Sequence, residues 1–258
     1  MISLMQLLLG LLAGTLVGFS LGLVGGGGSV LAVPLLVYFV GLHDPHLAIG
    51  TSAVAVTVNA ALSLAAYARA GQVKWPCSLT FATAGILGAF AGSTLGKATN
   101  GQHLLALFAG VMMVIALVML KRRGAAGDPG VRLSRESFPR VVGVGMGSGA
   151  LSGFFGIGGG FLIVPGLVIS TGMPMLNAVG SSLVAVTAFG LTTSVNYAVS
   201  GLVSWPLAAM VVGGGTAGSL VGMRLSKRLA GQKGRLNVAF AVIVFSVGLY
   251  VLARSLIG

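Results

Sequence analysis

Acidic residues are almost absent from this sequence of 258 residues. Only Asp44, Asp128 and Glu136 are present, against 15 Lys and Arg residues, so the formal charge is +12. All three acids fall in segments that we predict to be loops. The missing carboxylates argue against a proton relay and against a cation site built on negative charge inside a membrane. They also leave a buried Ser–His–Asp triad without its acid.

Charged residues of either sign are scarce, at 7% of the chain, whereas 56% of the residues are hydrophobic. A soluble domain carries about 25% charged residues. The apolar stretches lack an alternating polar pattern, so we predict an all-α integral membrane protein and not a barrel. The opening residues, 1–14, have no basic n-region, and we expect them to belong to the first membrane segment, not to a cleaved signal.

Residues for a metal, a cofactor or nucleic-acid binding are equally sparse. Cys77 is the single cysteine, so no intramolecular disulfide is possible. His43 and His46 flank Asp44 at a spacing that suits a metal or a proton, but the second half of the chain has no such histidines, which favours a solvated loop. A charge of +12 would suggest nucleic acid in a soluble protein, whereas cytoplasmic loops of membrane proteins are rich in Lys and Arg. We therefore predict no metal, no cofactor, no nucleic acid and no enzymatic activity.

The apolar residues form ten segments with a polar stretch between the fifth and the sixth. The segments 29–41 and 160–172 each contain a proline and have 13 residues, which is too few to cross a membrane alone because a spanning helix needs about 20. We divide the chain into a first transmembrane repeat at 1–120, a cytoplasmic basic linker at 121–140 and a second transmembrane repeat at 141–258. The segments lie at about 4–24, 29–41, 47–69, 76–96 and 103–120, and then at 141–156, 160–172, 177–199, 205–224 and 236–257.

The two halves are copies of each other. Residues 50–97 and 180–227 are identical at 17 of 48 positions, whereas a composition this biased gives roughly five matches by chance. Tyr67 and Tyr197 are one such matched pair. Rows of small residues recur in both halves at helical spacing and predict close helix packing. These rows are Gly85, Gly88 and Gly92, and Gly215, Gly218 and Gly222.

The basic residues predict how the halves are oriented. One cluster is in the linker and a second follows the ninth segment, and both are expected to be cytoplasmic. The segments between them make an even number of crossings and the last segment adds one, so each half crosses an odd number of times. Two such halves have opposite orientations, and the sequence therefore predicts inverted-topology repeats of about five helical segments each. The clusters are Lys121, Arg122, Arg123, Arg132, Arg135 and Arg140, and Arg224, Lys227, Arg228, Lys233 and Arg235.

Consecutive glycines distinguish the phrase "GLVGGGGSVLAVP" at 22–34 and its partner "GFFGIGGGFLIVP" at 153–165. They predict broken or re-entrant helices, where free N–H groups at the next helix start form an anion site without a formal charge. A tight turn with purely structural glycines is the alternative. The candidate substrate-binding residues here are Gly25, Gly27, Gly28, Ser29, Gly156, Gly158, Gly159 and Gly160.

Hydroxyl and amide side chains accompany these phrases. Thr51 and Ser52 open one long apolar segment, and Ser181 and Ser182 open its copy. These hydroxyls are candidates for substrate contact, with helix N-capping as the alternative. Asn59 and Asn196 lie in helix interiors, where an amide needs a partner, and complete the candidate site. Such a lining of N–H and O–H donors suits an oxyanion.

The doubled glycine phrase, the "GTS" and "GSS" segment openings, the paired W-P dipeptides and the basic linker resemble the TauE/SafE sulfite exporter family, also called the toluene-sulfonate uptake permease family. The resemblance covers nearly the whole chain. It implies a multi-pass carrier of the bacterial or archaeal cytoplasmic membrane for sulfite, sulfoacetate or another organosulfonate. The halves differ within the phrase, where Gly26 matches Ile157 and Ser29 matches Gly160, so the two half-sites are not identical.

We therefore predict a secondary transporter, most simply an exporter, that binds a small anion in the lipid bilayer. An anion channel shares the same fold logic but differs in kinetics. A membrane-embedded enzyme or assembly subunit is the other alternative, and it lacks buried catalytic residues in this sequence. A homo-oligomer is compatible with all three.

Overall fold

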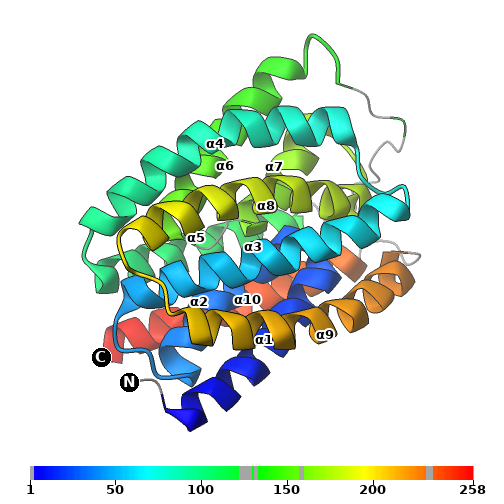
Figure 1. The fold of residues 1–258 in the computed structure, drawn as a ribbon. Helices are drawn as coiled ribbons and strands as arrows, with labels where there is room; N and C mark the ends of the chain where they lie inside the picture. Colours follow the sequence, from blue (N-terminus) through cyan, green and yellow to red (C-terminus); the bar gives the residue numbers. More distant parts are fainter. Residues whose placement is uncertain (1–2, 122–129, 131–132, 157–159, 231–234, 258) are drawn as a thin grey trace.

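Helices form every regular element in the described part of the chain (Figure 1). The computed structural model describes residues 3–121, 130, 133–156, 160–230 and 235–257. The elements of the first half are α1 (Leu4–Val24), η1 (Gly25–Leu31), α2 (Ala32–Pro34), η2 (Leu35–Phe39), α3 (Pro45–Arg69), α4 (Trp75–Ala98) and α5 (Gly101–Lys121). Those of the second half are α6 (Phe138–Phe155), α7 (Gly160–Thr171), α8 (Met175–Val199), α9 (Trp205–Ala230) and α10 (Arg235–Ile257). The linker residues 122–129 and 131–132 lie outside the described residues.

Local sequence explains where the key helices begin and end. Asp44 caps α3, its carboxylate accepting a hydrogen bond from the His46 N–H at 2.8 Å, and Pro45 occupies the first helical position. Gly25 ends α1 at φ 63° and Gly156 ends α6 at φ 65°. This left-handed conformation favours glycine, because it carries no Cβ. The predicted glycine breaks therefore occur at equivalent positions of the two halves.

Five helices among the described residues are long and apolar enough to cross a membrane, namely α1, α3, α4, α8 and α9. Large apolar side chains on their outer faces are exposed, for example Leu87 at 69% and Leu191 at 56%. A soluble protein buries such side chains, whereas a bilayer provides them with an apolar solvent. The all-α membrane fold is thereby confirmed.

Helix α1 of the first half packs along α9 of the second half, and α6 of the second half packs along α4 of the first half. On α1, Gly14 and Gly22 lie against the backbone of Val211 and Ser219 on α9. Helices α6 and α4 pack in the same way. In both pairs the contacting residues follow each other in the same direction along the two helices, so the helices of each pair run parallel.

The predicted small-residue rows also pack closely: a side chain at Gly88, Gly92, Gly218 or Gly222 would overlap the main chain of the partner helix. A side chain at Gly85 or Gly215 would overlap the side chain of Phe189 or Asn59. The predicted role of these rows in close packing is confirmed.

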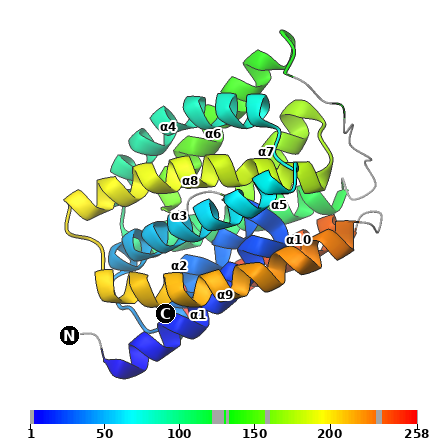
Figure 2. The same cartoon turned by 45° about the vertical axis from the view of Figure 1, so that its right-hand side comes forward.

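Helices α3 and α8 pack against each other at the centre of the molecule (Figures 1 and 2). Gly50 near the start of α3 lies against Leu202 just after α8, and Gly180 near the start of α8 lies against Gln72 just after α3. These equivalent helices therefore run antiparallel, with reciprocal contacts. Inverted copies require such an arrangement. The orientation of each copy within a membrane stays a prediction.

The first half contains a hairpin that turns back inside the molecule. Gly22 lies against Ser219, whereas α9 continues to Ala230, so α1 ends before the far end of the molecule. Helix α3 runs parallel to α9 and hence to α1, because Thr51 meets Ser204 and Asn59 meets Gly215. Elements η1, α2 and η2 must then return to the end where α1 begins. The tip of this hairpin, at the glycine run, is buried inside the molecule.

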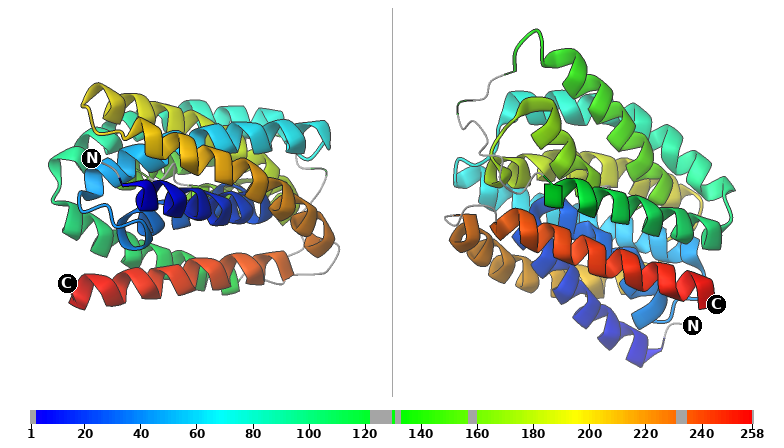
Figure 3. Two further views of the ribbon diagram at one scale, coloured as in Figure 1. Left: turned by 60° about the horizontal axis from the view of Figure 1, so that its bottom comes forward. Right: turned by 180° about the vertical axis from the view of Figure 1, so that it is seen from behind.

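Six of the long helices form two groups of three that meet at the seam between α3 and α8, while α5 packs along α10. One group contains α1, α3 and α9, and the other contains α6, α8 and α4. Both chain termini lie at the same end of the molecule (Figure 3). Each group therefore combines helices from both halves, so neither half of the sequence is an independent body.

Tyr67 and Tyr197 provide a matched test of this packing. Both side chains are buried, but the Tyr67 hydroxyl donates to the Gly22 carbonyl at 2.8 Å whereas the Tyr197 hydroxyl has no partner. We expect Tyr67→Phe to lower the free energy of unfolding by about 1 kcal/mol, since it removes one buried hydrogen bond. Tyr197→Phe should leave that free energy unchanged or raise it. Thermal unfolding of the two variants in detergent measures these changes. Equal losses of stability in both variants would contradict the assigned hydrogen bond of Tyr67.

Candidate functional site

The two glycine breaks meet in the interior. A Cβ atom on Gly26 would lie 2.8 Å from the Cα of Gly160, and one on Gly160 would overlap the backbone of Gly26. Both glycines are buried, and Ser29 beside them has no exposed surface. Segments 134 residues apart in the sequence therefore cross with main chain against main chain. We call this place, defined by Gly26, Ser29, Gly160 and Ser182, the crossing.

One hydrogen bond at the crossing joins the two halves, and two more lie within them. The Gly26 N–H donates to the Ser182 hydroxyl oxygen at 3.0 Å, and that hydroxyl donates to the Val179 carbonyl at 2.8 Å. The Ser29 hydroxyl donates to the Gly26 carbonyl at 2.9 Å. The polar groups here are all neutral, and they include one backbone N–H and two hydroxyls as donors. Such a set can bind an anion without a competing negative charge.

The glycine run is more ordered than the sequence suggests. The sequence predicts a broken helix here, and the break is short: Gly25 ends α1, and residues 25–31 continue as a 3-10 helix. Gly27 lies within it, and Gly28 packs back onto the main chain of Ser20 and Leu21, where any side chain would overlap. Close packing thus explains Gly28 and Gly160 without a ligand. Gly158 and Gly159 lie outside the described residues, and Gly156 packs against Ile49.

The paired hydroxyls do not cap their helices. The prediction of N-caps at Thr51–Ser52 and Ser181–Ser182 is wrong, because α3 begins at Pro45 and α8 at Met175. Asp44 and Pro45 start α3 about two turns earlier, since a carboxylate cap followed by proline is a strong helix start. The hydroxyls of Ser52 and Ser182 instead donate to carbonyls three residues back, at 2.8 Å each.

Thr51 and Ser181 join the halves by a reciprocal pair of hydrogen bonds. The Thr51 hydroxyl oxygen accepts the Ser204 N–H, and the Ser181 hydroxyl oxygen accepts the Lys74 N–H, both at 2.9 Å. Thr51 matches Ser181 in the repeat, and Lys74 matches Ser204. These two hydroxyls hold the turns before α4 and α9, and the structure does not bring them to the crossing.

Asn196 lies far from the crossing. It is 14 residues from Ser182 on the same helix, which corresponds to about 21 Å. Its side-chain oxygen accepts from the Lys97 Nζ at 2.7 Å, its backbone oxygen accepts from the same atom at 3.2 Å, and its amide donates to Ser93 at 2.6 Å. Sequence reasoning missed Lys97 as its partner, although Lys97 is one of the 17 positions shared by both halves.

Asn59 has no hydrogen-bond partner although it is fully buried. Both amide atoms are unpaired, and the side chain packs against Gly215, where a Cβ atom would overlap it. Its equivalent in the second half is Phe189, which packs against Gly85 in the same manner. The two halves therefore differ at mid-depth, polar in the first and aromatic in the second.

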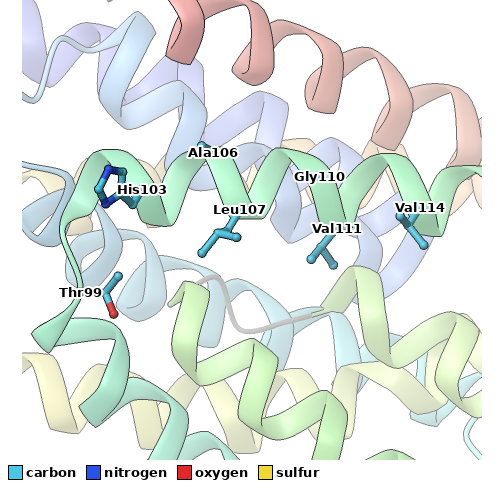
Figure 4. A pocket seen from close by; sticks show the side chains of 7 residues that line it. All are labelled: Thr99, His103, Ala106, Leu107, Gly110, Val111 and Val114. Atoms are coloured by element: carbon cyan, nitrogen blue, oxygen red, sulfur yellow. The ribbon is translucent and has the colours of Figure 1, made fainter.

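A groove of about 850 Å³ runs along the outer face of α5. Figure 4 shows Leu107, Val111 and Val114 on the same side of this helix, with Thr99 and His103 at one end. Its lining is almost entirely apolar, and Leu107 and Val114 are more than half exposed. Such a surface suits lipid chains and offers few donors to an oxyanion.

Comparison with known proteins agrees with this geometry. The family model described as "Sulfite exporter TauE/SafE" matches residues 10–251. The chain belongs to the TauE/SafE family. A probable membrane transporter protein of Xylella fastidiosa is 50% identical over 245 residues, covering 94% of both chains. The probable membrane transporter protein YunE of Bacillus subtilis is 29% identical over 246 residues, covering 86% of this chain and 87% of its own. No solved structure matches the chain.

Membership of the TauE/SafE family and the apolar helices together identify the functional class of this protein and its location in the cell. The chain is a multi-pass protein of the inner membrane, and it is a membrane transporter. The residues of the crossing are then the natural candidates for a substrate site, because broken helices at mid-membrane are where secondary transporters bind ions and small molecules.

Proposed function

We propose that this chain is a secondary transporter that exports a small sulfur-containing oxyanion, such as sulfite or an organosulfonate, and binds it at the crossing. The observation that carries the proposal is a hydrogen bond inside a buried helix break, from the Gly26 N–H of the first half to the Ser182 hydroxyl oxygen of the second half. The interior lacks a carboxylate, since Asp44 and Glu136 are the acids of the described residues and both lie outside helices. An anion therefore meets donors and no opposing charge.

Ser182 is the residue that lets an anion compete with the protein's own hydrogen bonds. In this structure its hydroxyl oxygen is the acceptor for Gly26. An oxyanion next to Ser182 would replace that acceptor, so that the Gly26 N–H and the Ser182 O–H both donate to the ligand. A hydrogen bond to a charged partner is roughly twice as strong as a neutral one, which favours the exchange.

Alternating access can arise at the seam between α3 and α8. One side-chain hydrogen bond, between Thr57 and Ser194 at 3.4 Å, connects these helices directly. Gly190 lies against Thr57 there without a side chain of its own. The hydrogen bond between Thr51 and Ser204 lies within the group of α1, α3 and α9, and the one between Ser181 and Lys74 lies within the group of α6, α8 and α4. Each bond would therefore move with its own group. The seam is thus the place where one group can rock against the other.

Sulfite flux in proteoliposomes tests the proposal. We expect saturable sulfite transport, and we expect Ser182→Ala to lower its efficiency about tenfold, the equivalent of one buried hydrogen bond to an anion. Ser78→Ala is the matched control, because Ser78 is also buried and donates to a carbonyl of its own helix but accepts nothing from the other half. A current that rises without saturation would identify a channel, and no anion flux at all would overturn the proposal.

A further inference from the structure

The outer face of α9 near its C-terminal end contains a pocket with two arginines. Its volume is about 270 Å³, and it is lined by Val221, Arg224, Leu225 and Arg228. The spacing of these positions, i, i+3, i+4 and i+7, places them on one side of the helix. We call this the α9 basic pocket.

The charge of the α9 basic pocket is not balanced by the described residues. Arg224 and Arg228 are both exposed, and neither has an ion pair with a described residue. Like charges four residues apart on a helix repel each other. Asp44 lies at the opposite end of the molecule, where α3 begins, and Glu136 precedes α6, which packs on α4. Among the described residues no acid pairs with these arginines, so an external anion is a partner that fits this face.

The same pocket continues into an apolar surface. Val221 is 55% exposed and so is its neighbour Leu220, as expected for side chains that face lipid chains. From Val221 to Arg228 the helix rises by about 10 Å. This distance takes the surface from the acyl region of a bilayer to the level of its headgroups. A ligand that matches it has an apolar tail and an anionic head.

We infer that the α9 basic pocket binds an anionic phospholipid of the phosphatidylglycerol class. The two guanidinium groups would hold the phosphate, for which Arg offers paired N–H donors, while the acyl chain lies along Val221 and Leu225. The basic residues predict that this end of α9 lies in the cytoplasmic leaflet, where juxtamembrane Lys and Arg attract anionic lipids. This inference is independent of the transported substrate.

Thermal unfolding of the full chain in detergent, titrated with dioleoyl phosphatidylglycerol, tests the inference. We expect the lipid to raise the unfolding temperature, and we expect Arg224→Gln with Arg228→Gln to raise the half-saturating lipid concentration about tenfold to thirtyfold. Arg69→Gln is the matched control, since Arg69 is exposed in the last turn of α3 at the same end of the molecule. Native mass spectrometry should show one bound lipid fewer in the double variant.

Several outcomes would overturn the inference. An unchanged half-saturation in the double variant would remove the arginines from lipid binding. An equal response to dioleoyl phosphatidylcholine would show that the head charge is not recognised. Stabilisation by inorganic phosphate alone would identify a site for a free anion, and a dimer that only the double variant dissociates would assign this face to a second copy of the chain.

Discussion

Gly160→Ala is expected to abolish transport by separating the two helix breaks. The added methyl group would overlap the carbonyl, the carbonyl carbon and the Cα of Gly26. Main chain cannot rotate away as a side chain can, so the two segments must move apart. Overpacking of this kind costs about 1–3 kcal/mol or more. The same displacement would move the Gly26 N–H away from Ser182.

Gly147→Ala is the control for this variant. Gly147 lies in α6, is exposed and has open space where a Cβ would be placed. Alanine in the interior of a helix is more favourable than glycine by about 1 kcal/mol, so this control should be as stable as the parent or more so. Proteoliposome flux and thermal unfolding measure both variants. Full transport by Gly160→Ala would show that the crossing is not as tight as the structure indicates.

Asn59→Leu is expected to make the protein more stable and less active. A buried amide with no partner costs about 1–3 kcal/mol, and leucine has the same branched shape and number of side-chain heavy atoms, although its methyl groups are larger. We therefore expect the free energy of unfolding to rise by about 1–2 kcal/mol. Transport should fall about tenfold or more, because we propose that the Asn59 amide finds its partners only when the group that contains α3 rocks against the group that contains α8.

Asn196→Leu separates this effect from a general effect of losing an amide. Asn196 is hydrogen-bonded to Lys97, Ser93 and Thr94, so its replacement should lower stability where that of Asn59 raises it. Thermal unfolding in detergent and sulfite flux are measured on the same preparations. If Asn59→Leu is stabilised and transports normally, Asn59 has no part in the transport cycle.

Much of the architecture could be predicted from the sequence because local patterns determine it. The all-α membrane fold, most of the segment limits and the close packing at the glycine rows are confirmed, although α9 continues past the predicted end at 224 to Ala230. The equivalent glycines Gly25 and Gly156 end α1 and α6 with nearly the same φ. In a chain whose helices are set by runs of apolar residues, composition and periodicity carry this information directly.

The roles of individual polar residues were harder to predict, because their partners are remote in sequence. Thr51 and Ser204 are separated by 153 positions, and Lys97 and Asn196 by 99. Nothing near a hydroxyl or an amide tells which distant N–H or ammonium group it meets. The conformation of the glycine run was hard to predict for another reason, since glycine permits a 3-10 turn as readily as an irregular loop. Gly28 is required by its contact with α1, which sequence alone does not show.

A structure determined with sulfite bound tests the central claim most directly. We predict an anion at the crossing, with its oxygens about 3 Å from the Gly26 nitrogen and the Ser182 hydroxyl oxygen, and with the present bond between those two groups replaced. Sulfite bound elsewhere at a saturating concentration, for example at Arg224 and Arg228, with the bond between Gly26 and Ser182 intact, would contradict the account.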